Sequence, residues 1–222
     1  MTLFDAYRQL GLLVGLPVVI VASACAAIIV VVRDWRIALL GYAVLSAMLA
    51  LLLSRVIPVE WAMLQVLVGV LIAIMLYLSA SQLRGLSRPR AHWRTRWPQV
   101  SSLTSFRAMA VLLTAGIFLL THDRVPLPLV ESLIRDAILW LVAVGILGLG
   151  LHEEPLHAGL SLLSILGGVE LLLFSLTQRR MVVGLVEGGQ ILLGLAIAYL
   201  MLSRGLASAT PTEETPAPEW QA

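Results

Sequence analysis

The sequence predicts an all-α integral membrane protein with seven transmembrane helices. Of the 222 residues, 59% are hydrophobic and only 13% are charged, and the mean hydropathy is +0.95, outside the range typical of soluble domains. Seven apolar segments approach the ~20 residues that a helix needs to cross a bilayer. Charged residues gather between these segments and are rare within them.

The predicted spans follow one another with short polar connections. The first begins before Cys25 and continues past it, so we expect a retained span and not a cleaved signal. Short polar turns or tips lie between neighbouring spans at 33–36, 54–55, 152–155 and 178–180. The tail 205–222 is rich in Ala, Thr, Pro and Glu and is expected to be disordered. The spans are 10–32, 37–54, 61–80, 104–121, 133–151, 157–177 and 181–203.

The connection 81–107 carries six arginines and no acidic residue. By the positive-inside rule it faces the cytoplasm, which places the N-terminus outside and the C-terminus inside the cell (inner or plasma) membrane. Tryptophans alternate with arginines there, a pattern that could bind RNA but more often marks contact with anionic lipid or another subunit. We therefore expect no nucleic acid as partner. The residues expected to make this contact are Arg84, Arg88, Arg90, Trp93, Arg94, Arg96 and Trp97.

Composition also excludes several cofactor proteins. All fifteen basic residues are Arg, so no lysine can form a retinal Schiff base. The four His residues lie in connections or at segment ends, which leaves no facing pair of haem ligands in mid-membrane. A single Cys provides neither a disulfide framework nor a metal cluster. We expect no cofactor, no metal site and no catalytic residue.

Two acidic residues inside the last two spans are the candidate site. Glu170 lies eight residues before the tip at 178–180 and Glu187 seven residues after it. A helical hairpin folded at that tip would bring both carboxylates to one level, ~10–12 Å below the membrane surface. Buried carboxylates there handle protons or cations, or else act as hydrogen-bonding glue between helices. Both interpretations remain open from the sequence.

The sequence also contains two similar stretches. The stretches 33–84 and 152–204 each contain a polar turn, a long apolar span, a polar tip, a second span and a closing Arg. With the preceding span, each becomes a three-helix unit of the same orientation, which predicts a parallel repeat. The resulting organisation is a first unit in 1–80, a basic loop with the fourth span in 81–132, a second unit in 133–204 and the tail.

The second unit resembles the three-helix K subunit of proton-pumping NADH:quinone oxidoreductase. The motifs are Gly-Ile-Leu-Gly-Leu at 145–149, the turn 152–155, Gly-Val-Glu-Leu-Leu at 168–172, and Gln190 followed by Gly-Leu-Ala at 194–196. The doubled, seven-span form resembles the E component of hydrogenase-4, which the first unit matches at 33–36 and Gly41-Tyr42. The resemblance implies a non-catalytic subunit of a complex I-like or membrane-bound hydrogenase-type complex, with antiporter-like and redox subunits as partners.

In that family, acidic residues of the second and third helices form a polar axis for protons. Glu170 falls on the first position, whereas Gln190, which cannot ionise, stands at the second. Glu187 lies one turn earlier and could take over, with Gln190 as its hydrogen-bonding neighbour. Arg135 and Asp136 either connect the glutamates to the outer surface or are interfacial residues.

Two further expectations concern the surroundings of the site. His152, Glu153, Glu154 and His157 cluster at the inner mouth, as a proton-collecting group or as a solvated turn. Glycines 167, 168, 184, 188 and 194 suggest close helix approach. Two other functions remain open: a structural subunit that binds lipid and partners, and a stand-alone transporter.

Overall fold

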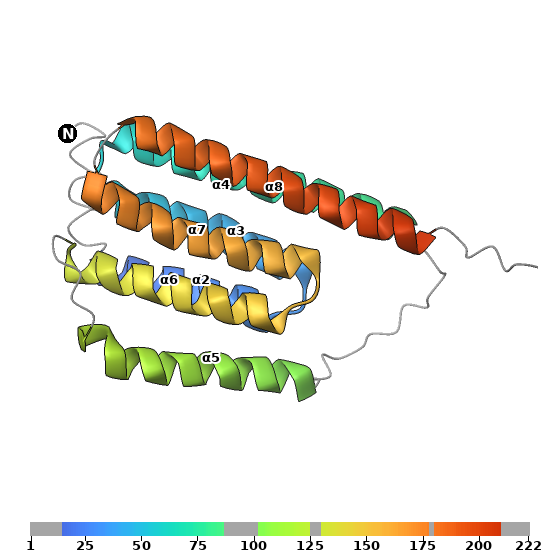
Figure 1. Ribbon diagram of the computed structural model, residues 1–222, viewed down its shortest axis with the longest axis horizontal. Coiled ribbons are helices and arrows are strands. Elements are labelled where there is room, and N and C mark those ends of the chain that lie inside the picture. The colour runs from blue at the N-terminus through green and yellow to red at the C-terminus, as the bar shows by residue number, and fades with distance from the viewer. Residues whose placement is uncertain (1–14, 87–101, 125–129, 178–179, 210–222) are drawn as a thin grey trace, which may run out of the picture.

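The computed structural model describes residues 15–86, 102–124, 130–177 and 180–209, and within these ranges the chain is helical and contains no strand (Figure 1). Polar turns separate the helices, so each apolar stretch forms one straight rod. The elements are α2 (Gly15–Val31), α3 (Trp35–Leu53), α4 (Val59–Leu86), α5 (Ser102–Thr121), the 3₁₀ turn η1 (His122–Arg124), α6 (Ser132–Leu151), α7 (Pro155–Thr177) and α8 (Arg180–Ala209).

Six of these helices, α3 to α8, are long and apolar enough to cross a membrane. The described part of α2 has 17 residues and is also apolar, while residues 10–14 of the predicted first span lie outside the described ranges. Helix α4 continues to Leu86, beyond the predicted end at residue 80. Helix α8 continues to Ala209, so the expected disorder is wrong for 205–209, where Leu and Ala favour helix and the first Pro comes at 211.

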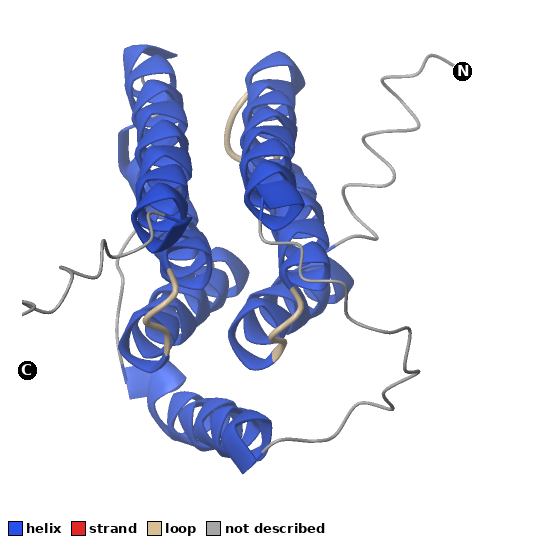
Figure 2. Cartoon of the chain, turned by 90° about the vertical axis from the view of Figure 1, so that its right-hand side faces the viewer, coloured by secondary structure: helices blue, strands red, loops and turns tan. Residues whose placement is uncertain are grey.

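The helices form two rows of three. Along the chain, α2 packs on α3 and α3 on α4, while α6 packs on α7 and α7 on α8. Between the rows, α2 contacts α6, α3 contacts α7, and α4 contacts α8, as Figure 1 and the end view in Figure 2 show. Helix α5 lies along one edge against α2 and α6. The core therefore sits between the rows.

Specific polar contacts fix the ends of the rows. Asp34 caps α3, its side chain accepting a hydrogen bond from the backbone N–H of Arg36 at 3.1 Å. The guanidinium of Arg55, in the α3–α4 turn, lies 3.6 Å from the carboxylate of Glu131 before α6. The ion pair joins the two rows at the end where α4 and α8 begin.

Glycines allow close approach at some of the predicted positions and not at others. A Cβ at Gly168 would meet the backbone oxygen of Ile138 at 3.3 Å, and one at Gly167 or Gly194 would touch side chains of α3 or α4. At Gly184 and Gly188 the structure places no described atom within 4 Å. The packing prediction is wrong for those two positions, because they lie on the face of α8 that turns away from the bundle.

Candidate functional site

A buried polar cluster lies where α7 and α8 meet α3 and α4. Its centre is Glu170 of α7, which is 2% exposed and accepts a hydrogen bond from the side-chain amide of Gln190 of α8. Gln190 is 1% exposed. Both residues lie on the inner faces of their helices, so the bond joins α7 to α8 within the apolar interior.

Two more polar side chains lie beside this hydrogen bond, and a third interacts with it electrostatically. Glu187 of α8 and Gln65 of α4 lie beside the carboxyl of Glu170, and each is 2% exposed. Tyr42 of α3, also buried, lies close enough to both glutamates to interact electrostatically with them. Four helices, two from each row, thus supply one cluster.

The two glutamates lie at the same depth, as the hairpin spacing predicts. Glu170 is seven residues before the end of α7, and Glu187 is seven residues after the start of α8. At the rise of an α-helix, both lie ~10 Å inside the helix ends. The hairpin spacing predicted that Glu187 lies near Glu170, the resemblance assigned Gln190 to the second position of the polar axis, and the structure brings all three together.

Several oxygen atoms of the cluster have no hydrogen-bond donor among the described residues. They are Oε1 of Glu170, both carboxylate oxygens of Glu187, and Oε1 of Gln65. Two ionised carboxylates side by side in a low-dielectric site repel each other strongly. A shared proton or a bound cation would remove that repulsion and fill the unused acceptor positions.

Arg135 and Asp136 belong to a different group. Arg135 donates from Nε and a terminal nitrogen to Oδ1 of Asp136, both at 3.1 Å, and Nδ1 of His122 lies 3.8 Å from the same oxygen. The ring of His122 stacks on Phe118 of α5. This group lies at the α5–α6 edge, and it shares no member with the Glu170 cluster.

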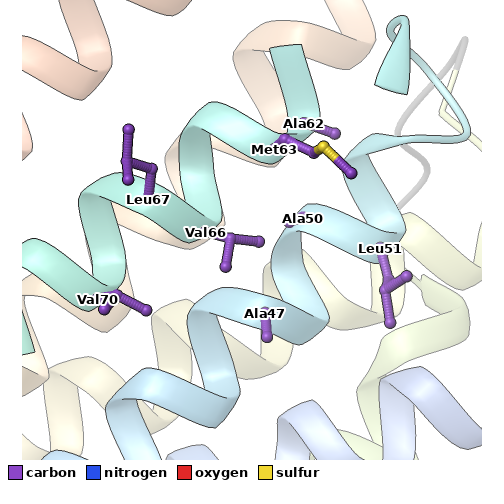
Figure 3. A pocket seen from close by; sticks show the side chains of 8 residues that line it. All are labelled: Ala47, Ala50, Leu51, Ala62, Met63, Val66, Leu67 and Val70. Atoms are coloured by element: carbon purple, nitrogen blue, oxygen red, sulfur yellow. The ribbon is translucent and has the colours of Figure 1, made fainter. Parts of the chain in front are cut away.

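The predicted lipid or partner contact lies almost wholly outside the described residues. Arg84 is part of α4, and the other six residues fall between 87 and 101. The described surface instead offers an apolar groove of about 550 Å³ between α3 and α4 (Figure 3). Ala47, Ala50 and Ala62 make it hollow, and Met63, Val66 and Leu67 form its wall. With no polar side chain in its lining, the groove suits hydrocarbon and offers no chemistry.

Tyr42 is the member of the cluster that sequence reasoning missed. Its only signal is a phenol in the middle of an apolar helix, and apolar helices often carry Tyr near their ends instead. Gln65 is a polar residue of the predicted third span, 61–80, but nothing in the sequence links it to Glu170. The link appears only when α4 packs on α8.

No group of three or more His, Cys, Asp or Glu side chains in the described ranges is arranged to hold a metal ion. No protein-family model, curated protein or solved structure matches the chain.

Proposed function

We propose that this protein is a membrane subunit that holds a proton or cation at the Glu170–Glu187 pair and passes it on. The observation that supports this most is the meeting of two buried carboxyls with three uncharged polar partners, Gln190, Gln65 and Tyr42, in an otherwise apolar interior. Ionisable groups inside a membrane are costly and are typical of ion pathways.

The atoms suggest how the pair would work. The amide of Gln190 donates to Oε2 of Glu170 and holds that oxygen in place. Oε1 of Glu170 and the oxygens of Glu187 remain available to bind and release a proton. A proton on one carboxyl can hydrogen-bond to the other, so the pair stores one charge with little reorganisation. The hydroxyl of Tyr42 and the amide of Gln65 can each accept or donate a hydrogen bond at the edge of the cluster.

We further propose that the parent assembly is complex I-like or of the membrane-bound hydrogenase type. Electron transfer in its redox subunits would change the hydration or protonation of the pair, and protons would pass laterally to antiporter-like subunits. This chain would carry no redox cofactor itself. Support comes from the motif resemblance and from the contacts of α2 with α6, α3 with α7 and α4 with α8, which suit two parallel three-helix repeats.

The proposal includes a topology. Seven spans with the N-terminus outside place the α6–α7 turn and the end of α8 on the cytoplasmic side. Helix α5 offers an apolar face to another subunit, because Met109, Leu112 and Leu120 are more than 70% exposed there. Anionic lipid would meet the basic connection between α4 and α5.

A structural role is the second candidate, and one observation favours it. The Gln190–Glu170 hydrogen bond joins two helices, and interhelical hydrogen bonds of this kind stabilise membrane bundles. In a purely structural subunit, Glu170→Gln would be harmless, because an amide at residue 170 can still accept from Gln190.

The test starts with mild-detergent purification of the tagged protein and mass spectrometry of its partners. Redox and antiporter-like subunits would support the parent assembly, and isolation alone or with unrelated proteins would overturn it. Proton pumping is then measured in membrane vesicles with the electron donor that the redox partners accept. We expect Glu170→Gln to reduce pumping by at least about 100-fold while the complex assembles normally.

The matched control is Glu60→Gln, an exposed glutamate at the start of α4. It should leave pumping and assembly unchanged. Normal pumping by an assembled Glu170→Gln complex would overturn the transport function and favour the structural one.

A further inference from the structure

A second buried titratable cluster lies at the opposite end of α7. His152 follows the last residue of α6, and His157 lies in the first turns of α7. Their rings stack with centroids 4.9 Å apart and planes 8° from parallel. His152 is 7% exposed and His157 is 1% exposed. Nothing in the Glu170 cluster uses this pair.

The contacts of the two rings define a route for a proton. Nδ1 of His152 lies 3.0 Å from the carbonyl oxygen of Gly148, so it carries the hydrogen in the neutral ring and leaves Nε2 as the basic atom. Nδ1 of His157 lies 3.2 Å from a carboxylate oxygen of Glu154, whose side chain is 62% exposed. An exposed carboxylate therefore touches a fully buried imidazole.

Charged groups of both signs lie around the two rings. Arg107 of α5 donates to the carbonyl of Leu151 at 3.5 Å and disfavours protonation of His152, whereas Glu154 favours it. Arg204 of α8 donates a hydrogen bond to the carbonyl of Glu153 at 3.0 Å and closes the turn. The backbone of Val32, the residue after α2, lies beside the ring of His157. Burial lowers the pKa of His152. Two stacked imidazolium ions would repel, so the pair holds one proton at a time.

Buried hydroxyls continue inward from His157 on the same face of α7. Ser161 and Ser164 follow at helical spacing and are 1% and 3% exposed. Each hydroxyl donates at 2.9 Å to the carbonyl four residues earlier, which leaves its oxygen free to accept. Ser164 lies six residues, ~9 Å along the same helix, before Glu170.

We propose that the stacked His152–His157 pair, loaded through Glu154, is the proton uptake site that supplies Glu170. A proton from water binds the Glu154 carboxylate and moves to Nδ1 of His157. The imidazolium then gives its Nε2 hydrogen to a base on the side of the buried hydroxyls and is left neutral with its hydrogen on Nδ1, and a tautomer exchange resets the ring for the next proton. Histidine suits this relay because its two nitrogens exchange roles near neutral pH. The inference rests on the proposed proton function of Glu170.

The experiment follows hydrogen–deuterium exchange of a single carboxyl. The full chain in liposomes is moved from H₂O to D₂O across a range of pH, and infrared spectroscopy records the C=O stretch of protonated carboxylic acids. The band that Glu170→Gln removes belongs to Glu170. We expect His157→Phe, which keeps a ring in the stack, to slow exchange of this band at least about tenfold.

Two further variants complete the design. Glu154→Gln changes an exposed side chain and should slow the same exchange, which keeps the test valid if His157→Phe does not fold. His122→Phe, at the other end of the bundle, should leave the rate unchanged.

Unchanged exchange in both Glu154→Gln and His157→Phe would overturn the uptake site while leaving the proton function of Glu170 intact. Absence of any band that Glu170→Gln removes would instead overturn the proton form of the proposed function, and the uptake site with it.

Discussion

The hydrogen bond between Glu170 and Gln190 permits a quantitative test of the site's geometry. Both side chains are at most 2% exposed, so removing one partner leaves the other buried without it. Replacing either residue by Leu should reduce the free energy of unfolding by about 1–3 kcal/mol. The double variant removes both polar groups and should lose less than the sum. The coupling should be about 0.6 kcal/mol, the average for interhelical hydrogen bonds in membranes, and at most about 1.7 kcal/mol.

The assay is reversible unfolding of the purified chain in mixed micelles, with helix content followed by circular dichroism as the denaturing detergent increases. The control cycle pairs Glu170→Leu with Gln82→Leu, an exposed residue near the other end of α4, and its coupling should be near zero. If the effects of Glu170→Leu and Gln190→Leu add within about 0.5 kcal/mol, the two side chains do not meet as described.

Two other predictions concern packing and pH. Gly148→Ala should destabilise the chain by about 1–3 kcal/mol, since its Cβ would overlap Oγ of Ser161. Gly150→Ala in the same helix meets no described atom within 4 Å and should change stability little. Equal effects in the same unfolding assay would refute this packing. Burial lowers the pKa of His152 below its ordinary 6.5, so the unfolded state binds more protons than the folded state at acidic pH. The free energy of unfolding should therefore fall as pH drops below 6.5. His152→Phe should reduce this fall, and an unchanged pH profile of unfolding in that variant would contradict the prediction.

The sequence predicted the helices well because apolar length is a direct consequence of bilayer thickness. It also predicted that Glu170 and Glu187 lie at one level, since both belong to a single hairpin and residue counts from the tip determine depth. Helix ends were harder to predict. Helix α8 reaches Ala209 because Leu and Ala extend a helix beyond the apolar span, and charge alone did not mark its end.

Lateral packing was the part that the sequence could not provide. Whether Gly184 faces a neighbour, or whether Tyr42 reaches Glu170, depends on how one hairpin is rotated against another, and both hairpins are apolar on nearly every face. Hydrophobic periodicity, which orients helices in soluble proteins, carries little information when the outside is also apolar. Only the polar residues then indicate which face of a helix packs inward, and these helices contain few of them.

The placement of the cluster suggests why the two rows differ in charge. Helices α3 and α4 contribute Tyr42 and Gln65, which are neutral, whereas α7 and α8 contribute both carboxyls and Gln190. Four carboxyls in one apolar interior would be severely destabilising, because each needs its own partner or proton. One charged hairpin packed against a neutral polar one gives a pair of carboxyls with hydrogen-bonding neighbours. If that division matters, Gln65→Glu should impair folding more than Gln65→Leu, a difference that the same unfolding assay can measure.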